Sequence, residues 1–132
     1  MANWNKALLL GDHSLDEHHQ ELFALETLLE KAMCSHQMSD LEGIILFLEH
    51  YVSDHFQQEE TLMQSHQFDG YDAHKEDHDH FTRCVDEIRF HFDAKQPLTH
   101  LIFKIRRLLD QLMAHIQHVD IKIAPLVRST HE

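Results

Sequence analysis

The chain has 132 residues, the size of a single domain with a substantial hydrophobic core. Its formal net charge of −12, counted with neutral histidines, argues against binding to nucleic acid or to anionic membrane surfaces. No apolar stretch approaches the roughly 20 residues of a membrane span, and the alternating pattern typical of strands is absent.

Four helices are predicted, because apolar residues recur every three or four positions along most of the chain. Residues 1–13 are expected to form an extended arm, with Trp4 anchored on the body. Capping-box patterns at Ser14 and Ser39 predict helix starts there, and Pro97 suits the first position of a last helix. The predicted helices span about 14–34, 40–66, 71–93 and 97–120, followed by a frayed tail over 121–132. Their short connections predict an all-α, up-down-up-down antiparallel four-helix bundle in one domain.

Polar residues stand at positions in these helices where the pattern requires buried apolar side chains. On the second, third and fourth helices, these inward polar residues are His55, Glu59, His74, His78, His115 and Asp120. On the first helix the spacing leaves open whether His18 or His19 points inward. A buried carboxylate such as Glu59 needs a cation or a donor as its partner. The set therefore indicates a metal site, and the alternative is a metal-free network in which every buried polar atom is hydrogen-bonded.

These motifs resemble those of the hemerythrin family and, by the length of the chain, those of stand-alone bacterial hemerythrins. The motifs that carry the resemblance are Asp16-Glu-His-His19, His55-Phe56 followed by Glu59-Glu60 and Met63, His74-Lys75 with His78 and Phe81, and His115-Ile116 with Asp120. The resemblance runs from Trp4 to about Pro125. One departure is Gln111, because the family usually has Trp four residues before its histidine on the fourth helix. This departure is expected to change the wall of the site.

The resemblance implies a centre of two non-haem irons with a bridging oxo or hydroxo group, and it places the first-helix ligand at His19. By the same resemblance, one iron would be held by His74, His78 and His115, the other by His19 and His55, and both would be bridged by Glu59 and Asp120. This ligand set would leave one position open for dioxygen, on the iron with two imidazoles. Neutral imidazoles outnumber carboxylates in the set, which should disfavour O–O cleavage and favour reversible binding.

An apolar wall should exclude water from the open position. Its candidate residues are Phe56, Leu112 and Ile116, although ordinary core packing would account for the same residues. The expected function is reversible dioxygen binding for oxygen storage, delivery or sensing, in a monomer with an electron donor or oxygen-using partner. The alternatives are a di-iron oxidase or peroxidase, a protein that handles nitric oxide or iron, and an iron-responsive interaction module. Cys34 and Cys84 form no CxxC motif, which suits the cytoplasm.

Overall fold

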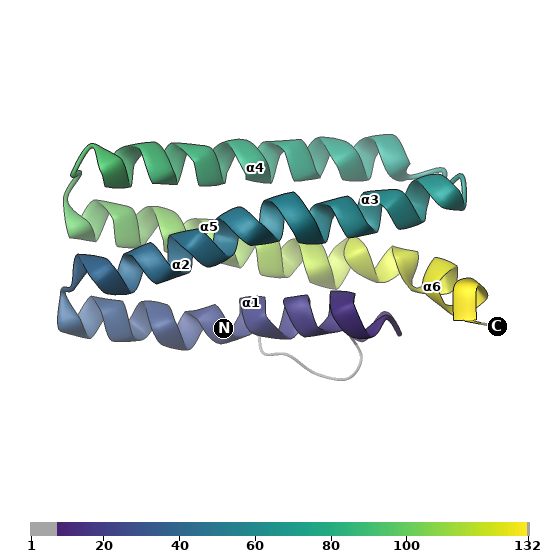
Figure 1. Ribbon diagram of the computed structural model, residues 1–132, viewed down its shortest axis with the longest axis horizontal. Helices are drawn as coiled ribbons and strands as arrows, with labels where there is room; N and C mark the ends of the chain where they lie inside the picture. The colour runs from purple at the N-terminus through teal and green to yellow at the C-terminus, as the bar shows by residue number, and fades with distance from the viewer. Residues whose placement is uncertain (1–7, 132) are drawn as a thin grey trace.

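The computed structural model describes residues 8–131, with side chains for residues 8–127. Four long helical segments lie side by side, each antiparallel to the next along the chain (Figure 1). The elements are α1 (His13–Ser35), α2 (Met38–His50), the π-helical turn η2 (Tyr51–His55), α3 (Phe56–Ser65), α4 (Tyr71–Asp93), α5 (Leu98–His118), the 3-10 turn η3 (Asp120–Ile123) and α6 (Ala124–His131). The predicted all-α four-helix bundle is confirmed. The anchoring predicted for Trp4 lies outside the described residues.

The first helix begins slightly earlier than predicted, and Ser14 is not its cap. Asp12 is the N-cap, and its carboxylate accepts a hydrogen bond from the backbone N–H of Leu15 at 3.0 Å. Ser14 instead donates to the side chain of Gln58, also at 3.0 Å. Asp16 stabilises this helix start, because its carboxylate accepts hydrogen bonds from two backbone N–H groups of the preceding arm, at 2.7 and 3.0 Å. The arm is therefore tied to the first turn of α1.

The predicted helix 40–66 is one continuous helical segment, but η2 interrupts its α-helical hydrogen bonding. Its start also differs, because Gln37 is the N-cap and Ser39 lies inside the helix. A π-helical turn inserts one residue and shifts the register of everything after it. On α3, Met63 is 0% exposed and lies on the same face as Glu59, four residues before it.

The frayed tail predicted over 121–132 is wrong for the described residues, because residues 121–131 fold as the end of η3 and as α6. Pro125 lies in the first turn of α6, where a proline is tolerated and leaves no intrahelical hydrogen bond unmade. Ile123 and Val127 are 0% and 1% exposed. The segment packs against α3, at the end of the bundle where α1 begins (Figure 1). Pro97 was predicted at the first position of the last helix; it is instead the N-cap of α5 and precedes its first turn.

Two apolar clusters fill the interior. The main core extends along most of the bundle and includes Leu22, Leu48, Phe56, Phe81 and Ile116. The end core consists of Leu10, Leu15, Met63, Ile123, Ala124 and Val127. Buried polar residues lie between the two clusters on α1 and on α3: His19 separates Leu15 of the end core from Leu22 of the main core, and Glu59 separates Phe56 from Met63. A polar layer therefore crosses the bundle near one end.

Candidate metal centre

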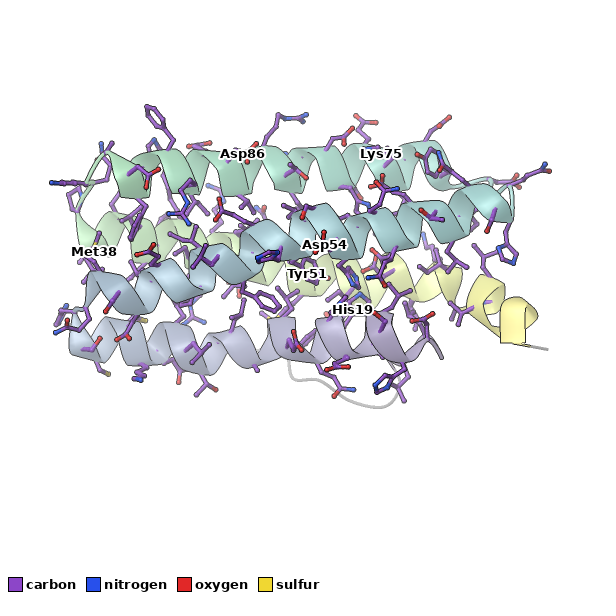
Figure 2. The ribbon with its side chains drawn as sticks, in the orientation of Figure 1. His19, Met38, Tyr51, Asp54, Lys75 and Asp86 are labelled. Carbon is purple, nitrogen blue, oxygen red and sulfur yellow. The ribbon has the colours of Figure 1, made fainter. Side chains whose placement is uncertain are left out.

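The polar layer brings together all seven residues that the sequence analysis singled out as metal ligands. These residues, each at most 5% exposed, are His19 from α1, His55 from η2, Glu59 from α3, His74 and His78 from α4, His115 from α5 and Asp120 from η3. Figure 2 shows His19 on the side of α1 that faces α3. His18 is only partly buried, so the inward residue left open by the spacing is His19.

One group of side chains gathers at the α4 and α5 side of the layer. His74, His78, His115 and Asp120 each offer one ligand atom, and these atoms all lie within 4.8 Å of one another. Oδ1 of Asp120 lies 2.9 Å from Nε2 of His74 and 2.8 Å from Nε2 of His115. Three imidazole nitrogens and a carboxylate oxygen thus point to one location.

A second group lies beside the first, on the α1 and η2 side. Its ligand atoms, from His19, His55, Glu59 and Asp120, also fall within 4.8 Å of one another. The two carboxylates contact both groups: Oδ2 of Asp120 is 3.2 Å from Nε2 of His19, and Oε1 of Glu59 is 3.5 Å from Nε2 of His55 and 3.3 Å from Nε2 of His78. Glu59 and Asp120 therefore join the two groups.

Many polar atoms of this layer are buried without a hydrogen bond. Within the described part of the chain, neither oxygen of Glu59 or of Asp120 forms one, nor does Nε2 of His74, His78 or His115. An unsatisfied buried polar atom costs roughly 1–3 kcal/mol. Bound cations would accept these lone pairs, and imidazoles mixed with carboxylates suit iron and related divalent metals. The residues form a metal-binding site whose donor atoms fit two ions.

The charges of the layer suit cation binding. Burial alone would raise the pKa of the Asp120 carboxyl, but the contacts with His115, His19 and His74 hold that pKa well below its usual value. Burial lowers the pKa of His19, yet its contacts with the carboxylates of Asp120 and Glu59 and their negative charges outweigh burial and raise that pKa to about 9. Without metal, the site thus holds a proton on His19, which a bound cation must displace.

A carboxylate outside the layer holds the second ring nitrogen of one inward histidine. Nδ1 of His78 lies 2.8 Å from Oε2 of Glu60, a residue 7% exposed. Such a partner keeps the ring proton on Nδ1 and leaves Nε2 free to bind metal. Asp77 lies 3.5 Å from Nδ1 of His115, which forms no hydrogen bond within the described residues. Sequence reasoning did not assign this role to Glu60, because Glu60 and His78 lie on different helices, which spacing along one helix cannot relate.

Apolar and aromatic side chains border the layer. The three residues predicted to line an oxygen pocket are buried: Phe56, Leu112 and Ile116. The ring of Phe56 stacks on His78, with centroids 3.8 Å apart and an interplanar angle of 2°. Tyr51, which the sequence analysis did not place at the site, stacks on His55 with centroids 4.4 Å apart. Aromatic rings thus hold imidazoles on both sides of the site.

Gln111, the departure from the family pattern, is exposed at the surface. It lines a groove of about 210 Å³ between α4 and α5, together with Cys84 and Leu108. Leu112, the next residue along α5, remains buried beside the layer. The position of the missing Trp therefore lies at an external groove, and the buried residue Leu112 beside it is unaffected.

Comparison with known proteins agrees with this geometry. A family model described as "Hemerythrin HHE cation binding domain" matches residues 10–127. The chain is 29% identical over 126 residues to a bacteriohemerythrin of Pseudomonas paraeruginosa, covering 95% of this chain and 80% of that protein. It is 30% identical over 120 residues to a hemerythrin-like protein of Naegleria gruberi (91% and 88% covered) and 27% identical over 120 residues to a myohemerythrin of Theromyzon tessulatum (90% and 88% covered). None of the described helices is long and apolar enough to cross a membrane. The chain belongs to the hemerythrin family.

Proposed function

We propose that this protein binds dioxygen reversibly at a centre of two non-haem irons with an oxo or hydroxo bridge. The observation that carries the proposal is the pair of buried imidazole groups joined by Glu59 and Asp120, whose oxygens form no hydrogen bond. Membership of the hemerythrin family supports iron as the metal.

In this proposal the two groups hold one iron each. His74, His78 and His115 bind the first, His19 and His55 bind the second, and Glu59 and Asp120 bridge them. When bound, the irons supply the electrons and the open coordination position that dioxygen requires. Because the second group has one imidazole fewer, the open position would be expected on the side of His19 and His55.

The protein's own contribution is to hold the ligands and to exclude water. Five neutral imidazoles and only two carboxylates give the irons little anionic stabilisation, which favours reversible binding over O–O cleavage. Phe56, Leu112 and Ile116 form a dry wall, since each is at most 2% exposed.

The proposal extends to the cellular setting. Both described cysteines are free thiols, as expected of a protein in the reducing cytoplasm. We take the protein to act there as a monomer, with an electron donor that returns the irons to the ferrous state. Its role would then be oxygen storage, delivery or sensing.

The test combines metal analysis with visible spectroscopy. Protein reduced anaerobically with iron and then exposed to air should contain two irons per chain and develop a visible band that disappears when oxygen is removed. The variant His19→Ala should lose metal and the band, while His118→Ala, at an exposed position on α5, should keep both. Irreversible oxidation with turnover of an added reductant would favour the oxidase or peroxidase alternative, and protein without iron would refute the proposal.

A further inference from the structure

Two consecutive histidines of α1 contact His55, one at each of its ring nitrogens. Nε2 of His19 lies 2.8 Å from Nε2 of His55, inside the polar layer. Nδ1 of His18 lies 3.0 Å from Nδ1 of His55, at the other end of the ring. The rings of His18 and His55 meet edge to face, with centroids 5.2 Å apart. His18 therefore supports the face of His55 that is turned away from the metal site.

The protonation of this pair follows from the role of His55. If Nε2 of His55 gives its lone pair to a metal, the ring proton resides on Nδ1 and is donated to Nδ1 of His18. His18 must then carry its own proton on Nε2. His18 lines a surface cleft of about 160 Å³ with His50 and Asp54, where water can accept that proton. The pair is thus fully satisfied without any charge on His18.

The other group of ligands has a different kind of outer partner. Nδ1 of His78 is held by the carboxylate of Glu60 at 2.8 Å. A carboxylate draws the ring proton toward itself and makes the imidazole a stronger electron donor to a metal, whereas a neutral imidazole does so less. The outer contacts thus make His55 a weaker donor than His78.

We propose that His18 is a positioning residue that fixes the ring of His55 for metal binding and, because it is uncharged, keeps the metal beside it harder to oxidise. This inference rests on the proposed two-metal site. It assigns the two neighbours on α1 separate functions: His19 binds the metal, and His18 orients the other histidine of the same group. An electronic difference between the two metals follows, with the open position on the metal that gives up electrons less readily.

Three substitutions of His18 test the contact at a single atom. In His18→Asn the side-chain oxygen takes the place of Nδ1 and still accepts the proton; His18→Leu has a similar shape without an acceptor; His18→Asp places an anion there. Titration with Co²⁺, followed by its visible absorption, measures affinity without any oxygen reaction. His18→Leu should weaken the binding of one of two Co²⁺ ions by about 10–100-fold, and His18→Asn should restore most of it. In iron-loaded protein, His18→Asp should lower the midpoint potential relative to His18→Asn.

The matched control is His50→Asn, which alters another histidine of the same cleft that has no contact with a proposed ligand. It should leave Co²⁺ affinity and potential unchanged. Equal Co²⁺ affinity in His18→Leu and the wild type would overturn the inference. So would a Co²⁺ affinity of His18→Asn no higher than that of His18→Leu, or identical midpoint potentials in His18→Asn and His18→Asp. Wild-type protein that binds no Co²⁺ and no iron would instead refute the proposed function on which the inference rests.

Discussion

Replacement of Asp120 by Asn tests the polar layer most directly, because this residue belongs to both ligand groups. Its oxygens lie 2.8 Å from His115, 2.9 Å from His74 and 3.2 Å from His19, and it is 0% exposed. The substitution keeps the size of the side chain, removes its charge and replaces one acceptor oxygen by an NH2 donor. Loss of packing therefore does not contribute to the result.

The magnitude follows from the loss of a buried charge partner. Removing one member of a buried ion pair costs about 3–5 kcal/mol, because the other charge stays buried without compensation. Burial and repulsion from Asp120 oppose the contacts with His55 and His19 that hold the pKa of Glu59 below its usual value, so relief of this repulsion offsets part of the cost. We expect a loss of about 3 kcal/mol in the free energy of unfolding of the metal-free protein. Metal-loaded protein should lose more, because Asp120 would also bind both ions.

Urea unfolding of chelator-treated protein, together with metal analysis of loaded protein, measures both effects. The matched control is Asp110→Asn, the same substitution at an exposed position on α5, which should change stability by no more than about 0.5 kcal/mol. If Asp120→Asn keeps the stability of the metal-free protein and still binds two metals with wild-type affinity, the shared role assigned to this carboxylate is wrong.

Three further predictions follow from the structure. Affinity for Co²⁺ should rise roughly tenfold per pH unit from neutrality up to about pH 9 and then level off. Below its pKa of about 9, His19 holds a proton that the cation must displace. Competition titrations across this range measure the affinity, and an affinity that does not change with pH would contradict the prediction. Gln111→Trp should cover part of the groove and slow maleimide labelling of Cys84, while the exposed Cys34 in the same molecule reacts as before; a gain of about 1 kcal/mol in stability should accompany this change. Val127→Ala should lower the free energy of unfolding by about 2 kcal/mol and speed the removal of metal by a chelator, because Val127 is 1% exposed in the end core. The control is Leu46→Ala, at a 47% exposed position, and equal stability of the two variants would argue against a packed end core.

The sequence was sufficient to predict the bundle and the polar layer because both depend on local spacing. Residues four apart, such as His55 and Glu59 or His74 and His78, share a helix face whatever the rest of the chain does. Spacing alone could not decide between His18 and His19, because adjacent residues differ by about 100° around the helix and both step to apolar positions. The family resemblance pointed to His19, and the burial of His19 inside the bundle agrees with it.

Features that depend on contacts between distant segments were missed. The capping pattern at Ser14 was a reasonable local signal, but the hydrogen bonds of Asp16 to the arm favour a helix start at Asp12. The π-helical turn η2 shifts the register of α3 and has no signature in hydrophobic spacing. The packing of the segment after Asp120 was missed, because the surface that buries Val127 is formed by the arm and α3 together.

The division of the interior into a main core and an end core has a consequence for local unfolding. The end core joins Leu10 of the arm and α6 to the bundle, and the polar layer separates it from the main core on α1 and α3. Without metal, the unsatisfied atoms of that layer should weaken this connection, so the end core can open as a separate cooperative unit while the main core, which includes Leu8, stays folded. Amide hydrogen exchange around Leu10 and in α6 should then report metal occupancy.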